Sequence, residues 1–177
     1  MKSGEVYKVV RSSLDPWCRA NGFKRAKSGM AGWYRPQGAH HVVFWFQCAQ
    51  SGWDACAGSK FTVEFQLSNE PVPGSGDRHR LPHFLSEAEL ETVRVIQNTV
   101  ISKLKKPPAD HPILQMDERV ASWYRSQFDP VLKKYESNDD LWLRYCEEAD
   151  VKRWCEFILE RLQRIVADMG RETSSTP

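Results

Sequence analysis

The sequence predicts an α+β fold, in which an antiparallel sheet of about four strands has helices packed mainly on one face. Apolar residues recur at helical spacing near both ends of the chain, over residues 6–18 and 151–169. Between residues 31 and 68, short segments rich in β-branched and aromatic residues are separated by turn residues, which is typical of strands joined by short connections. The predicted order is helix, three strands, two helices, strand, helix.

Length and composition favour one domain. The 177 residues are 41% hydrophobic and 27% charged, as in ordinary globular domains. We expect residues 1–170 to form a single domain and residues 171–177 to form a flexible tail. The net charge of +2 is smaller than is usual for a nucleic-acid-binding domain. Five cysteines without a Cys-x-x-Cys pattern, and no apolar run near the start, predict free thiols and a cytoplasmic location.

The first helix is predicted over residues 4–21. One apolar stripe runs along it, formed by Val6, Val10, Leu14, Trp17 and Cys18. Pro16 lacks a backbone N–H, so we expect a kink or a restart near Asp15. Gly22 is suited to end the helix as a left-handed cap.

Three strands follow. Residues 31–35 and 40–50 should form a hairpin, because Pro36-Gln37-Gly38 supplies turn residues between them. Residues 60–68 alternate between an apolar face, which includes Phe61 and Phe65, and a polar face, which includes Glu64. We expect the polar face to meet solvent. The loop of residues 50–59 carries Trp53, Asp54 and Cys56.

Residues 69–84 contain three prolines and two glycines, which predicts a long loop without regular structure over most of its length. Arg78, His79, Arg80 and His83 make this loop basic. Loops of this length inside a domain are more often functional or mobile than purely connecting.

The second half predicts two helices, a strand and a final helix. Ser86 and Glu89 form a capping box at the start of a helix that Pro107-Pro108 ends. A further helix is expected over residues 117–135, interrupted at Pro130. Residues 141–146 alternate as a strand, and residues 148–169 have the strongest helical periodicity, which Gly170 should end.

Short motifs in both halves carry a resemblance to a known family. They are Asn21-Gly22-Phe23-Lys24-Arg25, Trp33-Tyr34-Arg35, Phe61-Thr62-Val63-Glu64-Phe65, Asp139-Asp140-Leu141-Trp142 and Glu148-Ala149-Asp150-Val151-Lys152-Arg153-Trp154. Together they resemble the bacterial domain of unknown function 4304, over most of residues 5–169. The resemblance implies a small cytosolic α+β domain. It implies no established activity, catalytic residue or cofactor.

Sequence patterns typical of enzymes are weak. His79 and His83 have the four-residue spacing of helical metal ligands, but Pro82 lies between them, so we predict neither a metal nor another cofactor. A nucleophilic pair of Cys56 with His79 stays open, since contacts between distant residues are invisible in the sequence. No glycine-rich phosphate loop is present, and the paired carboxylates are expected at a turn and a helix start.

Aromatic residues suggest a binding surface. Residues 40–50 are apolar on both faces, so helices on one face alone would leave the other face open. An open face could form an exposed platform; a loop or the 117–135 helix covering it is the alternative. Seven residues are the candidates for binding: Trp33, Arg35, Trp45, Trp53, Arg78, His79 and Arg80.

These observations favour a non-enzymatic protein-binding module that uses the second sheet face and the basic loop. The alternative is a single-stranded nucleic-acid binder, with tryptophans for stacking and arginines for phosphates. A small hydrolase or transferase built on residues 50–59 and 69–84 is the second alternative. No membrane partner is expected, and the sequence assigns no oligomeric state.

Overall fold

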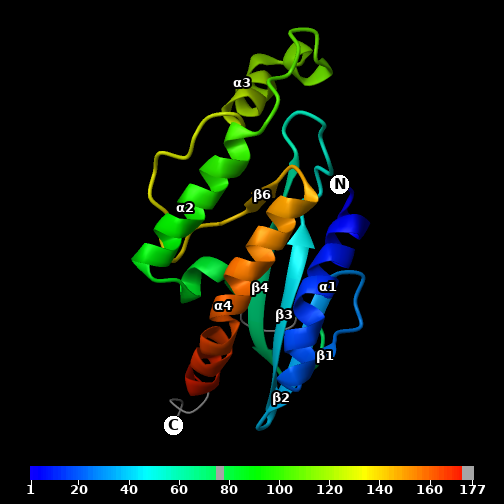
Figure 1. The fold of residues 1–177 in the computed structure, drawn as a ribbon, viewed down its shortest axis with the longest axis vertical. Helices are drawn as coiled ribbons and strands as arrows, with labels where there is room; N and C mark the ends of the chain where they lie inside the picture. The colour runs from blue at the N-terminus through cyan, green and yellow to red at the C-terminus, as the bar shows by residue number, and fades with distance from the viewer. Residues whose placement is uncertain (75–77, 173–177) are drawn as a thin grey trace.

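The computed structural model describes residues 1–74 and 78–172, and these residues contain four α-helices, two 3-10 helices and six strands. Their order along the chain is α1 (Ser3–Ala20), β1 (Lys24–Arg25), β2 (Ala31–Gln37), β3 (His40–Cys48), β4 (Ser59–Ser68), β5 (Arg78–Arg80), η1 (Leu81–Phe84), α2 (Glu87–Ser102), η2 (Pro112–Gln115), α3 (Glu118–Ser126), β6 (Leu143–Tyr145) and α4 (Glu148–Glu172) (Figure 1).

The strands form one antiparallel sheet in the order β1-β2-β3-β4-β5, with β6 also paired to β4. Both β5 and β6 use the same edge of β4, because β6 pairs with residues 59–61 and β5 with residues 64–66. The predicted α+β fold with an antiparallel sheet is confirmed. The expected number of about four strands is wrong, since β1 and β5 have only two and three residues and show no periodicity.

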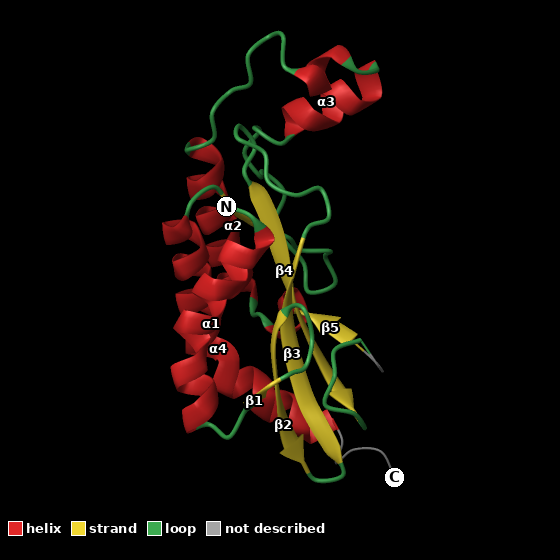
Figure 2. Ribbon diagram, turned by 90° about the vertical axis from the view of Figure 1, so that its right-hand side faces the viewer, coloured by secondary structure: helices red, strands yellow, loops and turns green. Residues whose placement is uncertain are grey.

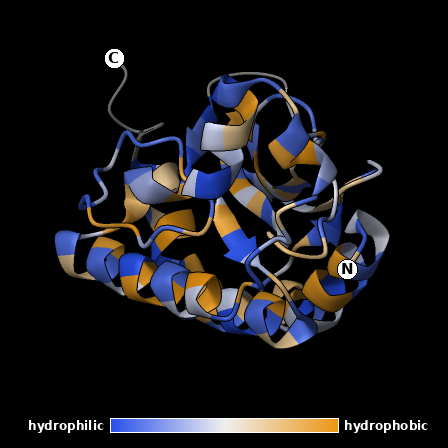
Figure 3. Cartoon of the chain, turned by 90° about the horizontal axis from the view of Figure 1, so that it is seen from above, coloured by the Kyte–Doolittle hydropathy of each residue, from blue (hydrophilic) through white to orange (hydrophobic). Residues whose placement is uncertain are grey.

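Helices α1, α2 and α4 lie on one side of the sheet (Figure 2). Hydrophobic and hydrophilic residues alternate along the long helices in Figure 3, as is usual for helices with one buried face. The core between the layers contains Phe44, Phe61 and Phe65 from the sheet and Trp154 from α4, all with no exposed surface. Each buried aromatic side chain of this size contributes about 2–3 kcal/mol to folding by leaving water.

Helix α1 runs through Pro16 without interruption, so of the two expected outcomes, a kink or a restart near Asp15, the restart does not occur. The turn around Pro16 is held by packing, because Leu14 and Cys18 are fully buried and Asp15 bonds to the sheet. The hairpin of β2 and β3 is confirmed, and Gly38 has a φ of +61° in its turn.

Residues 69–84 are more ordered than expected. They contain β5 and η1, so the prediction of a loop without regular structure is wrong for residues 78–84. Main-chain pairing with β4 supplies the order that the sequence pattern does not. Residues 75–77 of the predicted loop lie outside the described residues.

The capping box of α2 is confirmed: Glu89 N donates to Ser86 Oγ at 3.3 Å, and Ser86 N donates to Glu89 Oε2 at 2.8 Å. The helix expected over residues 117–135 is wrong in length, because α3 ends at Ser126. Beyond it, Asn98 on α2 exchanges two hydrogen bonds with the backbone of Val131, at 2.7 and 3.2 Å, and holds that segment extended along α2.

The predicted strand near residues 141–146 and the final helix are confirmed. Gly170 does not end α4, which continues to Glu172. A Cβ at position 170 would meet only the amide end of the Gln37 side chain on β2, a flexible group that can move aside. Of the predicted tail, residues 171 and 172 belong to α4 and residues 173–177 lie outside the described residues.

Candidate functional site

The predicted tryptophan platform is not present at the surface. Trp33 and Trp45 are each 1% exposed, and their register places them on opposite faces of the sheet. Trp33 faces the helices, stacks on Phe44 with 5.2 Å between ring centroids, and donates its indole N–H to Asp15 Oδ1 at 2.9 Å. Neither ring is free to bind a partner, which corrects the prediction for both residues.

The second face of the sheet is covered where solvent was expected. Thr62, Glu64 and Gln66 on β4 are at most 3% exposed. Gln66 donates to Val72 O at 2.7 Å and accepts from Gly74 N at 2.9 Å, so the segment after β4 folds back across this face. The expectation of a wet polar face is therefore wrong.

The arginines of β5 have partners within the chain. Arg78 and Arg80 both pair with Glu64, at 3.2 and 3.6 Å. Arg80 also pairs with Asp140 and lies 5.4 Å from the ring centre of Trp142. These two side chains bury and neutralise Glu64, which gives them a structural role beside any binding role.

The remaining basic candidates are also engaged. Arg35 donates to Asn21 O at 3.2 Å and lies 4.9 Å over the ring of Phe23. His79 stacks on His83 with 4.0 Å between ring centroids. His79 and Cys56 lie apart along β4, because His79 pairs with Phe65, six residues beyond the start of β4, whereas the loop of Cys56 precedes that start at Ser59. The open pairing of Cys56 with His79 is thus not formed.

Trp53 is the predicted aromatic residue that stays accessible, with 37% of its surface exposed. It borders a cavity of about 150 Å³ between the β3–β4 loop, β6 and α3. Figures 1 and 2 show α3 at one end of the molecule, beyond this loop. Its lining includes Trp53, Asp54, Lys60, Trp123, Tyr124 and Arg144.

Asp54 links the β3–β4 loop to α3. Its Oδ1 accepts from the backbone N–H of Cys56 at 2.8 Å, from that of Ala57 at 2.6 Å and from Tyr124 Oη at 2.9 Å. Burial raises the pKa of Asp54, but these hydrogen bonds outweigh burial and lower it from its usual value. Burial, followed by the Asp54 carboxylate, raises the pKa of Tyr124. Tyr124 is therefore a neutral donor to an ionised Asp54.

The loop also depends on Gly58, whose φ is +67°. A Cβ at this position would overlap the carbonyl oxygen of Tyr145 on β6. Asp54 and Gly58 exchange two backbone hydrogen bonds of 2.9 Å each, which close the loop. Glycine is thus required both for the backbone conformation and for the contact with β6.

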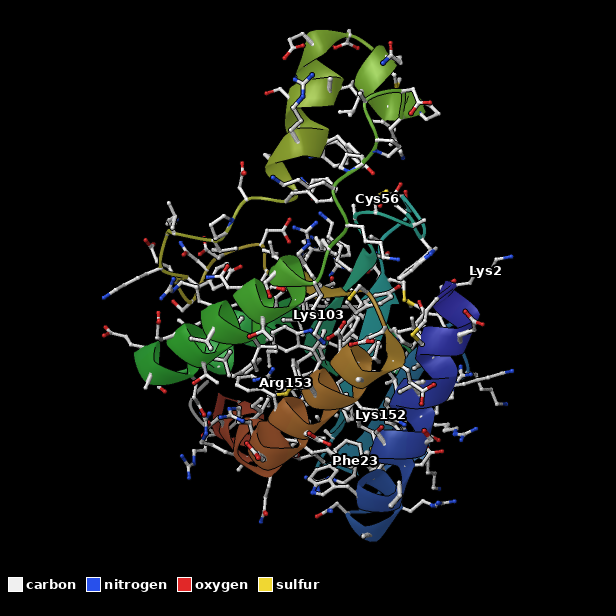
Figure 4. All side chains as sticks on the ribbon, turned by 45° about the horizontal axis from the view of Figure 1, so that its top comes forward. Lys2, Phe23, Cys56, Lys103, Lys152 and Arg153 are labelled. Atoms are coloured by element: carbon white, nitrogen blue, oxygen red, sulfur yellow. The ribbon has the colours of Figure 1, made fainter. Side chains whose placement is uncertain are left out.

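Asp54, Cys56 and His111 place one donor atom each within 4.8 Å of one another, a residue set suited to zinc. Figure 4 shows Cys56 on the loop next to the α3 end of the molecule. His111 Nδ1 lies 3.4 Å from the backbone nitrogen of Ile113, and its Nε2 lies 3.8 Å from Asp54 Oδ2. The three side chains thus form a compact group of potential metal ligands.

A second group of potential ligands, Cys146, Glu147 and Asp150, holds an ammonium group instead. Lys103 Nζ lies 2.7 Å from both Glu147 Oε1 and Asp150 Oδ1. Asp150 Oδ2 accepts from the backbone N–H of Cys146 and of Glu147, at 2.9 and 3.1 Å, and thus caps the start of α4. This group stabilises the junction of α2 and α4.

Sequence reasoning missed Trp123, Lys60 and Arg144. Trp123 is 53% exposed on α3 and also borders a second hollow of about 430 Å³ beside Val120. A signal for it existed, since Trp123 lies off the apolar stripe of Val120 and Tyr124. Lys60 and Arg144 gave no signal, because only the pairing of β4 with β6 brings them together.

Comparison with known proteins identified no relative: no family model, curated protein or solved structure matches the chain. The resemblance to the domain of unknown function 4304 stays a prediction. Within the described residues, no helix combines the length and the apolar character needed to cross a membrane.

Proposed function

We propose that this chain is a non-enzymatic protein-binding module whose binding surface is formed by α3, η2 and the β3–β4 loop. The observation that carries the proposal is the grouping of exposed apolar side chains in this region. Five large hydrophobic residues of the described chain are exposed. Among them, Trp53 belongs to the β3–β4 loop, Trp123 to α3, and Met116 lies directly after η2. Tryptophan and methionine are enriched at protein interfaces, where tryptophan often dominates the binding energy.

The shape of the region supports the same proposal. Trp123 borders both the cavity of about 150 Å³ and the hollow of about 430 Å³. A partner side chain can enter such concave sites while the flanking indole rings cover it. The second sheet face and β5, which the sequence favoured, are less suitable because their side chains are buried or paired.

The nucleic-acid alternative has less support. Two of its three stacking residues, Trp33 and Trp45, are 1% exposed, and stacking on a base requires an open ring face. Its phosphate-binding candidates Arg78 and Arg80 pair with carboxylates. A single-stranded DNA or RNA oligomer that binds at low salt and dissociates steeply with added salt would restore this alternative.

The test of the proposal is selection of short random peptides displayed on phage against the whole chain. Selected peptides are then labelled, and their affinities are measured by fluorescence anisotropy. Trp123→Ala and Trp53→Ala should each weaken binding by about tenfold or more, as truncation of a hot-spot tryptophan does. Leu132→Ala is the matched control, because Leu132 is 82% exposed and does not line either cavity.

Two outcomes would reject the proposal. One is that no peptide family is enriched over a selection on an unrelated protein. The other is that the selected peptides bind Trp123→Ala and Trp53→Ala as well as they bind the unchanged chain. Circular dichroism and thermal unfolding of each variant establish that the loss of binding is not a loss of folding.

A further inference from the structure

Two cationic side chains line the same cavity as Trp53 and Trp123. Lys60 on β4 and Arg144 on β6 are directly opposite each other in the sheet register, and both line the cavity. Side chains at such positions have Cβ atoms about 5 Å apart, and like charges there destabilise the sheet. Both residues are only partly exposed, so solvent screens their repulsion less than it would at an open surface.

These two charges are not neutralised within the described chain. Over residues 1–74 and 78–172, no carboxylate forms an ion pair with Lys60 or Arg144. The guanidinium of Arg144 donates to the backbone oxygen of Gln127 at 2.5 Å and to its Oε1 at 3.2 Å, which are neutral acceptors. Lys60 Nζ has an aromatic neighbour, Trp142, with 5.6 Å between the ammonium nitrogen and the ring centre.

The pKa values respond to this arrangement. Burial, and then the charge of Arg144, lowers the pKa of Lys60 from its usual value. Burial also lowers the pKa of Arg144. A bound anion would act in the opposite direction on Lys60, because it stabilises the protonated ammonium.

We propose that Lys60 and Arg144 form an anion subsite that takes a carboxylate side chain, Asp or Glu, of the bound partner segment. This inference rests on the proposed protein-binding function and names the chemistry of its ligand. The Lys60 ammonium supplies free N–H donors, and Arg144, fixed by Gln127, supplies the second positive charge. A cavity of about 150 Å³ has room for a carboxylate and a few waters, each of which takes about 30 Å³.

The surroundings determine where the carboxylate lies. Asp54 also lines the cavity, but its Oδ1 accepts three hydrogen bonds and its Oδ2 faces His111. The ligand carboxylate therefore belongs on the β4–β6 side, away from Asp54. Trp53 and Trp123 then flank it, so the partner segment should carry an apolar or aromatic residue next to its acidic residue.

The first arm of the test uses the peptides selected on the unchanged chain. They should be enriched in Asp or Glu beside an aromatic residue, and replacing that acid with its amide should weaken binding by about tenfold. Lys60→Met should cause a similar loss and should remove the difference between the acidic and amide peptides. Lys152→Met, a lysine on α4 that pairs with Glu148, is the control and should leave affinity unchanged.

The second arm needs no peptide. The chain, labelled with carbon-13 at its lysines, is titrated with sodium acetate and separately with inorganic phosphate, at constant ionic strength. Acetate should shift the Lys60 signals in a saturable way and raise the pKa of Lys60, while other lysines follow only the ionic strength. The assignment of the Lys60 signal is made with Lys60→Met.

The arms separate failure of the subsite from failure of the proposed function. If tryptophan-dependent peptides are selected but neither acidic residues nor Lys60 affect affinity, the subsite is rejected and the binding module stands. If no peptide is selected, the module is rejected, and a Lys60 signal unaffected by acetate rejects the subsite as well. Saturable binding of phosphate with little response to acetate would overturn the carboxylate in favour of a phosphorylated ligand.

Discussion

The Asp15 carboxylate links α1 to the edge of the sheet, and its removal should destabilise the chain more than removal of its charged partner. Asp15 accepts from Trp33 Nε1 at 2.9 Å and from Arg25 Nε at 3.2 Å, and it also pairs with the Arg25 guanidinium. In Asp15→Ala the indole N–H of Trp33 stays buried, at 1% exposure, without an acceptor.

The two partners differ in the free energy that they contribute. An unsatisfied buried N–H costs about 1–3 kcal/mol. The side chain of Arg25 is 61% exposed, so its ion pair contributes at most about 1 kcal/mol. We therefore expect Asp15→Ala to lower the free energy of unfolding by about 2–4 kcal/mol, and Arg25→Ala by less than about 1 kcal/mol. Asp15→Asn keeps an acceptor for Trp33 and should lower it by about 1 kcal/mol.

Urea unfolding, followed by tryptophan fluorescence and circular dichroism, measures these differences. In NMR spectra, the Trp33 indole proton should exchange with solvent slowly in the unchanged chain and rapidly in Asp15→Ala. That difference would locate the effect at Trp33. The reasoning is refuted if Arg25→Ala is as destabilising as Asp15→Ala, or if Asp15→Asn is as destabilising as Asp15→Ala. Either result would mean that the hydrogen bond to Trp33 is not the main contribution.

The same carboxylate predicts a dependence on pH. The hydrogen bond from Arg25 lowers the pKa of Asp15, against the effect of burial, and Trp33 lowers it further. A group whose pKa is lower in the folded state stabilises that state above its ordinary pKa, about 4 for Asp. This contribution is lost as the pH falls through the folded-state value. Unfolding free energies measured from pH 7 to pH 3 should therefore fall less steeply in acid for Asp15→Ala than for the unchanged chain.

Two further predictions concern the loop and the thiols. In urea unfolding, Gly58→Ala should lower the free energy of unfolding by at least about 1 kcal/mol more than Gly52→Ala does. Both glycines have a positive φ, but only a Cβ at position 58 meets a backbone carbonyl of β6. Equal losses of unfolding free energy in the two variants would contradict the overlap. Burial raises the pKa of Cys18 and of Cys155 to about 12. Both thiols stay protonated at pH 8, so a thiol reagent should label the partly exposed Cys56 first, and Cys18 and Cys155 only after unfolding. Mass spectrometry measures the labelling of each cysteine, and equal labelling rates for the three would contradict the prediction.

Long elements with strong local signals could be predicted from the sequence. The period of α4 and the capping box of Ser86 and Glu89 depend on residues within a few positions of each other, so local chemistry determines them. Short elements could not. Strands β1 and β5 have two and three residues, and pairing with β2 and β4 is what makes them strands.

Burial on the second sheet face could not be predicted either. The alternation through Thr62, Glu64 and Gln66 indicates a polar face, but it does not reveal what covers that face. Gln66 is satisfied by the backbone of Val72 and Gly74, and Glu64 by two arginines, so these two polar residues are buried with partners. Thr62 Oγ1 is buried without a hydrogen-bond partner among the described residues. Buried polar groups of this kind follow from tertiary contacts that no window of sequence contains.

Only part of the candidate site could be predicted from the sequence. Trp53 was identified because it lies beside the aromatic strands of residues 31–50, whereas Lys60 and Arg144 meet only through the sheet register. The α3 helix has nine residues and buries only Ala121 and Tyr124, so it adds little to the core.

Two polar contacts hold the edges of helix α3: Tyr124 donates to Asp54, and Arg144 donates to the backbone oxygen of Gln127, the residue that follows the helix. A tryptophan on its outer surface, 53% exposed, contributes little to packing within the chain. Its indole would contribute its full hydrophobic free energy only when a partner covers it, because this free energy scales with the apolar area removed from water. A small helix that carries an exposed tryptophan beside two cations, with which no carboxylate of the described residues pairs, supports the proposed binding role.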